Sequence, residues 1–452
     1  MALIVGIDLG RKSAHDASIL RRETAAQLGR SFRFFSTPDG IELLFASIAA
    51  VTQDQEEIAF VIDSPGKAWI PVAAVLKNRG YPVYRPSSYR VQKMRQAGHR
   101  KNKTNRIDAL TLARCLMTYP QDTAEVFLPQ KMQAQLDQLA RQRDRLVDSV
   151  RRRKQRVQDL SEAINPGLCT AAGGFLLTEA GRAFLRAYLD PRAAIRLGKQ
   201  RLMEFLQKRY RLTLEEERFE MIFQACKQAV QLYKAVRQDG QMPLDEAILQ
   251  DDMNWELDQL EREEKRALLL ENKIRECNHK LDPQDAMLSL PGVQHITAAG
   301  IRACIGDISR FNSLTKHRGF AGFYPSVRKT GDKDSAAMSI SKMSGNRYKR
   351  YLYLAAENAY KWDVDCAAFY HKRRERGHTH TQAVCAVANG KLLPRIHHLL
   401  KSLQQAEANA EHRPRYVFRD LDGNPISKAE ARAIIRAKWG QRKYGKKSLA
   451  NA

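Results

Sequence analysis

Three aspartates in the first quarter of the chain have the surroundings expected of ligands for a divalent cation. Asp8 ends the apolar run ALIVGIDLG, and Asp63 ends a similar run in EIAFVIDSPG. Asp108 follows a stretch from Arg85 to Arg106 that holds eight Lys or Arg and no acid. Carboxylate oxygens are ligands that Mg²⁺ prefers, and a basic flank holds a phosphate backbone. The set therefore predicts magnesium-dependent phosphodiester chemistry.

Asn105 lies three residues before Asp108 and on the same helical face, so its amide oxygen is expected to be a weaker ligand of the same ion. Each acid also has a structural alternative. Asp8 can be a turn residue, Asp63 a helix cap, and Asp108 a first-turn acid favoured by the helix dipole. We favour the metal site because the acids are expected at one edge of the sheet and belong to an ordered set of sequence motifs, which is given below.

The elements that must position these acids form an α/β unit of roughly the first 120 residues. ALIVGIDLG, DASIL and FRFFSTP predict two or three adjacent strands, and a helix is expected over residues 36–51. EIAFVIDSPG and YPVYRP predict further strands, with the helix AWIPVAAVLKNRG between them. Because ligands gather beyond the carboxyl ends of strands in such sheets, Asp8 and Asp63 are expected to be neighbours.

The middle of the chain predicts long helices. Between Met132 and Ile164, residues at alternating steps of four and three form a coiled-coil seam, which Arg143 and Arg153 interrupt. These arginines either snorkel or contact nucleic acid. A second helical stretch over residues 244–281 is expected to be the partner, in this chain or in a second subunit. Residues 166–240 read as a helical insertion without recognisable chemistry.

The last third begins with LSLPGVQHITAAGIRACIGDISRF. Its Pro291-Gly292-Val293 turn has the form of a helix-hairpin-helix, which presents backbone N–H groups to a phosphate; an ordinary helical hairpin is the alternative. The chain ends with eight basic residues against one acid between Lys428 and Lys447. This tail is expected to be poorly packed and to order only on an RNA or DNA partner.

Composition limits the class of partner. The chain has 452 residues, enough for two or three domains, and 76 Lys and Arg against 50 Asp and Glu give a net charge of +26. This excess points to nucleic acid rather than to a small metabolite. No apolar run of about 18 residues and no signal peptide are found, so we expect no membrane partner and a cytoplasmic location. Seven scattered cysteines without a CxxC pair predict neither disulfides nor structural zinc.

Eight segments occur in the order expected of the DEDD recombinases of bacterial insertion sequences. They are GIDLG, VIDSPG, KTNRIDA, LPGVQHITAAGIRACIGDISRF, RGFAGFYP, KTGDK, ISKMSGNRYKRYLYLAA and HTHTQAVCAVA. The chain thus resembles the family called "IS one-ten", and also the Piv/MooV DNA invertases, over about residues 3–120 and 286–400. Each segment alone is weak, whereas the ordered set is specific.

The resemblance implies four regions. These are a RuvC-like (RNase H-fold) metal-binding domain at 1–125, a helical coiled-coil connector with its insertion at 126–285, a mainly α-helical transposase domain at 286–405, and a basic extension at 406–452. It also implies a nucleoid-associated bacterial protein that uses Mg²⁺, acts on donor and target DNA, and is guided by a noncoding bridge RNA. Because strand exchange joins two duplexes, a homodimer or tetramer that forms through the coiled-coil stretch is expected.

By the resemblance, Asp8 matches the first carboxylate of the family, Asp63 a position usually held by Glu, and Asn105 and Asp108 the two acids of the helix. Thr330, in RKTGDK, falls where the family usually has its nucleophilic serine. Asp for Glu shortens the reach by one methylene, and Asn for Asp removes a charge and weakens magnesium binding. Threonine keeps the hydroxyl nucleophile, but its β-branch crowds an in-line phosphate.

The predicted function is that of a DNA transposase or recombinase that cleaves and exchanges strands through the metal-carboxylate site and the Thr330 hydroxyl. The substitutions leave two alternatives open: an inactive or weakly active nucleic-acid-binding protein derived from a transposase, and a RuvC-like junction endonuclease that uses water. Ser335 is a second candidate nucleophile. The other nearby serines, Ser339, Ser341 and Ser344, are more typical of helix caps or polar surface.

Overall fold

The chain divides into two compact units, residues 1–130 and 131–452. The computed structural model describes residues 2–10, 12–52, 56–63, 66–97, 105–210, 216–238, 240, 242–323, 329–330, 333–334, 346–409 and 414–442.

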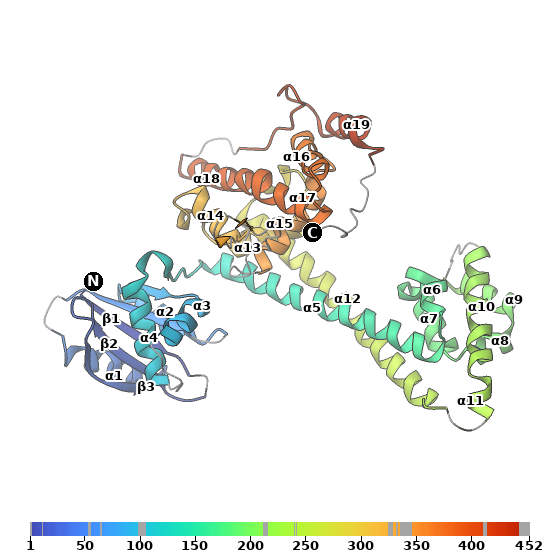
Figure 1. The fold of residues 1–452 in the computed structure, drawn as a ribbon, viewed down its shortest axis with the longest axis horizontal. Coiled ribbons are helices and arrows are strands. Elements are labelled where there is room, and N and C mark those ends of the chain that lie inside the picture. Colours follow the sequence, from blue (N-terminus) through green and yellow to red (C-terminus); the bar gives the residue numbers. More distant parts are fainter. Residues whose placement is uncertain are drawn as a thin grey trace. The chain divides into compact units, whose positions relative to one another are not determined.

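A six-stranded mixed sheet forms the centre of the first unit (Figure 1). Its spatial order is β3 (Gln27–Phe34), β2 (His15–Arg21), β1 (Leu3–Asp8), β4 (Ile58–Asp63), β5 (Val83–Arg85) and β6 (Ala124–Glu125). Strands β1, β4 and β5 are parallel to one another, β2 is antiparallel to both of its neighbours, and β6 is antiparallel to β5. The strands expected from the sequence are present, three of them from the first group of segments, and β6 is an addition.

Helices cover both faces of this sheet, which explains why β1 is apolar along most of its length. Residues Leu3, Val5 and Ile7 pack with α1 (Pro38–Ala49) and α2 (Trp69–Asn78). Because successive side chains of a strand point to opposite faces, Ile4 lies on the other face. There it packs with α3 (Ser88–Ala97) and α4 (Asn105–Thr118). The short 3₁₀ helix η1 (Pro120–Asp122) follows α4.

Two long helices, α5 (Lys131–Ile164) and α12 (Glu246–Leu281), run side by side in the second unit (Figure 1). Arg143 contacts Glu271 at 2.7 Å, whereas Arg153 contacts Glu263 at 2.9 Å, so the two helices are antiparallel. The expected partner of the first helix is thus within the chain. The two arginines that interrupt the seam form ion pairs between the helices, which disfavours the alternative of nucleic-acid contact.

The insertion has a core of its own at one end of this helix pair. Phe184 and Phe219 are buried there together with Val157 and Leu160 of α5 and Met253 of α12. The elements of the insertion are α6 (Leu168–Ala172), η2 (Gly173–Leu177), α7 (Glu179–Tyr188), α8 (Pro191–Leu197), α9 (Lys199–Tyr210), α10 (Glu216–Leu232) and α11 (Lys234–Gln238). The segment is helical, as the sequence predicted.

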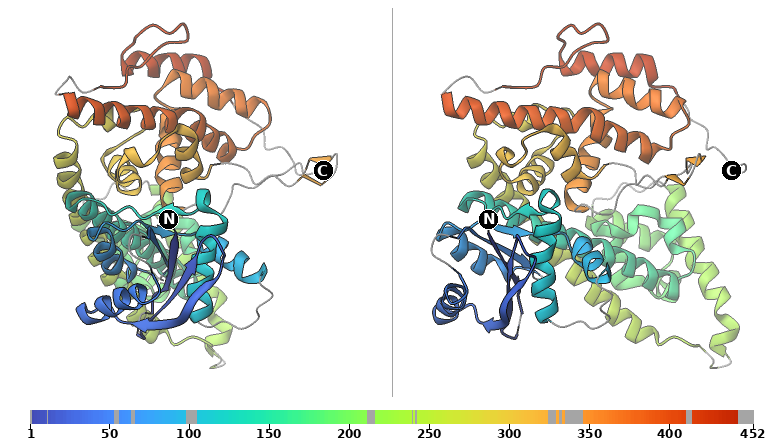
Figure 2. Two further views of the ribbon diagram at one scale, coloured as in Figure 1. Left: turned by 90° about the vertical axis from the view of Figure 1, so that its left-hand side faces the viewer. Right: turned by 60° about the vertical axis from the view of Figure 1, so that its left-hand side comes forward.

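The C-terminal part is a second group of helices, which Figure 2 shows in yellow to red from two further sides. Its core centres on α15, where Tyr351, Leu352 and Ala355 are buried. The elements are η3 (Ala286–Ser289), α13 (His295–Ile305), η4 (Ile308–Arg310), α14 (Leu314–Ala321), β7 (Lys329–Thr330), β8 (Lys333–Asp334), α15 (Asn346–Ala359), α16 (Val364–Glu375), α17 (His380–Val387), η5 (Ala388–Leu392), α18 (Leu393–Asn409) and α19 (Lys428–Trp439).

The turn at Gly292 differs from the expected helix-hairpin-helix. The element before the turn is the short 3₁₀ helix η3 rather than an α-helix. Gly292 has φ +74°, and a Cβ there would lie 2.1 Å from the carbonyl oxygen of Ala355 in α15. The close approach of α15 therefore requires a glycine at this position. The Pro-Gly-Val turn is thus explained by packing, without a phosphate-binding role.

The expectation of a poorly packed tail is wrong for residues 414–442. The Trp439 ring of α19 stacks on His371 of α16, with ring centroids 5.1 Å apart. Ala431 and Ile435 of α19 are buried against Val364 and Ala367. An apolar stripe on α19, masked in the sequence by the surrounding basic residues, therefore docks this helix on the C-terminal core.

The cysteines are not cross-linked in the described structure. All seven cysteines are free thiols, four of them buried. Burial raises the pKa of the Cys115 thiol to about 11, as expected for an inert core residue. Within the described part of the chain, no helix is both long and apolar enough to cross a membrane.

Candidate metal centre at the strand ends

Asp8 and Asp63 are register partners at the carboxyl ends of the parallel strands β1 and β4. Neighbouring strands lie about 4.8 Å apart, and register partners point to the same face of the sheet. The expectation that these acids are neighbours is confirmed. On the other side of β1, Asp16 of β2 is also a register partner of Asp8. Three carboxylates therefore lie in a row across β2, β1 and β4.

Helix α4 covers the face to which this row points. Asp8 shares its face with Ile4 and Gly6, because side chains alternate along a strand. A Cβ at Gly6 would lie 1.9 Å from the carbonyl oxygen of Ala109 and 2.8 Å from the backbone nitrogen of Ala113. The glycine thus lets the backbone of α4 cross directly over β1. Without it, the helix could not approach the sheet so closely.

The first turn of α4 lies toward the row of acids. The Nε atom of Arg106 is 3.9 Å from Oδ1 of Asp16. Asp108, which immediately precedes the contact residue Ala109, is buried, with 6% of its surface exposed. The helix therefore brings a fourth carboxylate to the same side of the sheet as the row. Its first-turn position also suits a negative charge, because the N-terminal end of the helix dipole is positive.

Arginines balance the charge of these acids. Nη2 of Arg95 lies 2.7 Å from Oδ1 of Asp108, although its N–H groups are not aligned for a hydrogen bond. Asp63 has Arg85 at 3.9 Å. Like charges directly opposite one another on adjacent strands are destabilising, so the guanidinium groups offset repulsion within the row. Among the described residues, no three Asp, Glu, His or Cys side chains are yet arranged to hold one metal ion.

The donor set nevertheless suits a hard cation such as Mg²⁺. Every candidate donor is an oxygen, and most carry a negative charge. In addition, Oδ2 of Asp16 is buried and has no hydrogen-bond donor among the described residues, whereas Oδ1 of Asp108 is already paired with Arg95. A buried carboxylate oxygen without a donor is costly, and a divalent cation beside Asp16 would compensate it. The residues of this sheet edge therefore fit Mg²⁺.

The remaining predicted residues are only partly described. Asn105 is the first residue of α4, one turn before Asp108, but its side chain lies outside the described part of the structure. Thr330 belongs to the second unit, where it is the register partner of Lys333 in a two-stranded sheet. Its side chain, like the whole of Ser335, Ser339, Ser341 and Ser344, is not described.

Sequence reasoning missed Asp16. The segment DASIL was recognised as a strand, but nothing in its local pattern shows that its first acid lies opposite Asp8. The signal that could have found it is the register of the β1–β2 hairpin, which depends on the conformation of the connecting residues.

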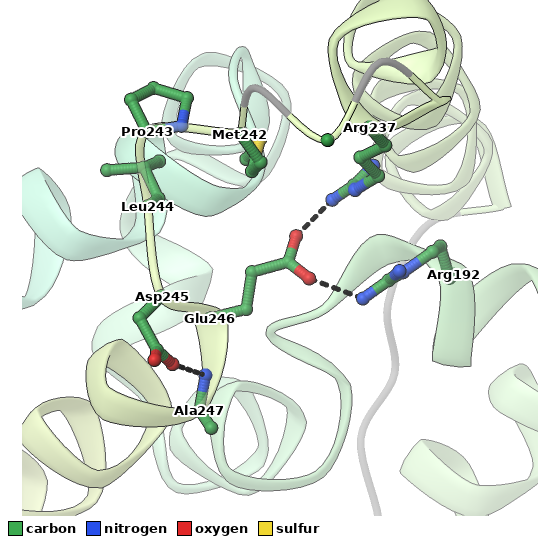
Figure 3. A pocket seen from close by; sticks show the side chains of 9 residues that line it. Arg192, Arg237, Met242, Pro243, Leu244, Asp245, Glu246 and Ala247 are labelled. Carbon is green, nitrogen blue, oxygen red and sulfur yellow. Dashed lines mark hydrogen bonds and ion pairs between the residues drawn. The ribbon is translucent and has the colours of Figure 1, made fainter.

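A pocket of about 700 Å³ in the second unit is lined by residues of the insertion and of the start of α12 (Figure 3). Arg192 and Arg237 both contact the carboxylate of Glu246 there. Asp245 caps α12 by accepting a hydrogen bond from the backbone N–H of Ala247 at 3.0 Å. Because these charged groups neutralise one another, we assign the pocket no role in phosphodiester chemistry.

Comparison with known proteins identifies the family. Residues 5–166 match a model for DEDD transposases of the IS110 group, described as "Transposase", and residues 284–371 match the "Transposase IS116/IS110/IS902 family". The chain belongs to the IS110 family of transposases. The first match spans the sheet, α4 and α5. This IS110-family transposase is therefore by class a DNA-modifying enzyme, with DNA as the implied substrate.

Three insertion-element proteins are similar to this transposase. The "Insertion element IS110 uncharacterized 43.6 kDa protein" of Streptomyces coelicolor is 23% identical over 394 residues, which cover 87% of this chain and 92% of that protein. The "Insertion element IS116 uncharacterized 44.8 kDa protein" of Streptomyces clavuligerus is 24% identical, covering 76% and 83%. The "Insertion element IS900 uncharacterized 42 kDa protein" of Mycobacterium paratuberculosis is 27% identical, covering 53% and 60%.

Proposed function

We propose that this transposase cleaves and exchanges DNA strands at a Mg²⁺ site that includes Asp8, Asp63 and Asp108, with Asn105 as a weaker ligand. The observation that carries the proposal is the in-register pairing of Asp8 with Asp63 beneath α4. The strand order β3-β2-β1-β4-β5, in which β2 alone runs opposite to the others, supports a RuvC-like RNase H fold for this domain.

Different side chains would bind the metal ion and the DNA backbone. Mg²⁺, when bound, would neutralise the charge that develops on the scissile phosphate. Asp8 and Asp63 are held by two central strands and Asp108 by α4, so the ligands come from rigid elements. Helix α3 and the basic residues that follow it would hold the DNA backbone beside the site, because they carry a high density of Lys and Arg.

Thr330 is the proposed nucleophile. Its Oγ1 attacks the phosphorus, forming a threonine–phosphate bond while one bridging P–O bond of the DNA breaks. The threonine hydroxyl loses its proton, and the departing DNA oxygen takes up a proton to leave as a hydroxyl group. A second DNA hydroxyl then attacks the phosphothreonine by the reverse of these steps, so strands are exchanged without an external energy source.

Two partners complete the proposal. A noncoding bridge RNA would pair with donor and target DNA, so that base pairing rather than side chains selects the sequence. The net charge of +26 supports binding of more than one nucleic-acid strand. A homodimer or tetramer would bring two duplexes together. The subunits would meet through the coiled-coil stretch, where α12 leaves the large apolar side chains Trp255, Leu268 and Leu269 exposed.

The covalent step is tested with a suicide DNA substrate, in which a nick beside the cleavage site traps the protein–DNA adduct. We expect the wild-type protein to form the adduct in Mg²⁺, Thr330→Ser to retain it, and Asp8→Ala and Thr330→Ala to lose it. Thr315→Ala, at an exposed threonine of α14, is the matched control and should behave as wild type.

The other outcomes separate the alternatives. An adduct that persists in Thr330→Ala shows that another residue, such as Ser335, is the nucleophile. Strand cleavage that needs Asp8 but gives no adduct identifies a junction endonuclease that uses water. DNA binding without cleavage in the wild-type protein, with no effect of Asp8→Ala, identifies an inactive nucleic-acid-binding protein, to which the Asn105 substitution would have contributed.

The RNA partner is tested in the same assay. RNA transcribed from the noncoding sequence beside the gene is added or withheld, and an RNA of equal length and scrambled sequence is the control. We expect cleavage to require the flanking RNA and to move to a new site when its pairing segment is changed. Equal cleavage with the scrambled RNA would exclude guidance by this RNA.

A further inference from the structure

Asp16 is a buried acid beside the proposed metal site to which neither the resemblance nor the proposed function gives a role. Its exposed fraction is 1%, and it is the register partner of Asp8 across the β1–β2 pair. Its Oδ1 atom lies 3.4 Å from Nε of Arg33 in β3 and 3.9 Å from Nε of Arg106 in α4. Its Oδ2 atom has no hydrogen-bond donor among the described residues.

These contacts are poor compensation for a buried charge. Both arginine side chains are 64% exposed, and both contacts are longer than a normal charge-assisted hydrogen bond of about 2.7–2.9 Å. Asp16 also faces a like charge, because Cβ atoms of register partners lie only about 4.5–5.5 Å apart. A carboxylate in this position is expected to be destabilising unless a further positive charge is bound nearby.

The row of acids shows where that charge would lie. Asp16, Asp8 and Asp63 follow one another across three adjacent strands and point to the face covered by α4. The position that the resemblance gives to the first helix acid is held by the neutral Asn105. The site therefore has one carboxylate fewer than the resemblance implies, and one extra buried carboxylate at its edge.

We propose that Asp16 is a fourth acidic residue of the divalent-cation site and supplies the negative charge that Asn105 lacks. The inference rests on the proposed function, since it adds a residue to the same site. Arg33 and Arg106 balance the carboxylate until the cation binds. Their exposed side chains are then free to turn into solvent, where they would meet the phosphate backbone of the DNA.

The test is Mn²⁺ binding by the full chain, measured by isothermal titration and by the loss of the free-ion signal in electron paramagnetic resonance. We expect Asp16→Asn to weaken Mn²⁺ binding by on the order of tenfold or more. Adding Asn105→Asp to Asp16→Asn should restore the affinity, because the lost carboxylate is replaced within the same site. Asp282→Asn is the matched control: Asp282 is also fully buried and forms an ion pair with Arg302 at 3.0 Å, but belongs to the other unit.

Arg106→Gln provides a second test that does not disturb a buried residue. Removal of the competing cation should strengthen Mn²⁺ binding several-fold. Arg22→Gln is its charge-matched control, because Arg22 lies at the opposite end of β1, where its N–H donates to the carbonyl oxygen of Ala2. If Asp16→Asn does not fold, a rise in affinity in Arg106→Gln alone supports the proposal.

The failing outcomes are distinguishable. Mn²⁺ binding that is lost in Asp8→Ala but unchanged in both Asp16→Asn and Arg106→Gln would mean that Asp16 is only a structural ion-pair residue, and would leave the proposed function intact. Weaker binding in Asp16→Asn that Asn105→Asp does not restore also overturns the proposal. Binding that is unchanged even in Asp8→Ala would remove the metal site itself, and with it the proposed function.

Discussion

Substitution of Gly6 by alanine tests whether the approach of α4 to β1 positions the acids. The added Cβ would lie 1.9 Å from the carbonyl oxygen of Ala109, whereas ordinary contacts begin near 3.4 Å. The helix and the strand must therefore separate by about 1.5 Å, the difference between these two distances. The obstructing atoms, the carbonyl oxygen of Ala109 and the nitrogen of Ala113, belong to the backbone, so no side chain can rotate out of the way. Overpacking of this kind costs about 1–3 kcal/mol.

We expect two measurable effects of Gly6→Ala. Thermal unfolding of the first unit should shift down by several degrees. Because Asp108 immediately precedes Ala109, the same displacement moves its carboxylate away from Asp8, and a misplacement of about 1 Å can reduce a rate on the order of 100-fold. Cleavage of the suicide substrate and Mn²⁺ affinity should therefore fall more than the loss of stability alone explains.

The control is Gly319→Ala in α14. A Cβ at Gly319 meets no other atom within 4 Å, so this change should leave cleavage unaltered and leave stability unchanged or slightly increased. A Gly6→Ala protein that unfolds within about one degree of wild type and cleaves at the wild-type rate would refute the reasoning. It would show that α4 can move without cost or that the separation of Asp108 from Asp8 is irrelevant.

Two predictions concern the second unit. Burial lowers the pKa of His317 to about 3, and its ring contacts Tyr348 at 2.8 Å and His397 at 3.2 Å. The folded pKa is below the unfolded value of 6.5, so the stability contributed by neutral His317 is fully present above pH 6.5 and is lost as the pH falls toward 3. The free energy of unfolding by urea should therefore differ by up to about 2–3 kcal/mol between pH 7.5 and pH 4.5. An equal pH dependence in His317→Phe would contradict this prediction. Arg347 of α15 pairs with Asp144 of α5 at 2.8 Å. Because Arg347→Met leaves that largely buried carboxylate undercompensated, it should cost about 2–3 kcal/mol by urea unfolding at pH 7.5, whereas a loss below about 1 kcal/mol would show that the remaining partners suffice.

Asp144 also contacts two further side chains of α15, one aromatic and one basic. The Tyr351 hydroxyl donates to Asp144 at 2.6 Å, and Arg350 lies 3.4 Å from the same carboxylate. These residues join α15 to the long helix α5. Basic and aromatic side chains of α15 therefore form an intramolecular contact. Its partner lies about 200 residues earlier, so no local pattern reveals it.

Local periodicity along the chain was enough to predict the regular elements. Alternating and continuous apolar runs located β1 to β5, and steps of four and three located α5. A second helical stretch over residues 244–281 indicated its partner α12. The strand ends placed Asp8 beside Asp63, because parallel strands of one sheet end at the same edge. The first turn of α4 likewise followed from Asp108 and the basic run before it. Each of these inferences needs only residues that are close in the chain.

Features that depend on strand register and on contacts between distant segments could be found only in the folded chain. Asp16 faces Asp8 because of the β1–β2 register, and a shift by one residue would have turned it to the other face. Gly6 and Gly292 are required by helices that pack against them, and α19 docks through Trp439 despite its basic composition. Local patterns specify which residues are apolar or charged, whereas the neighbours that they meet are fixed by how the elements pack together.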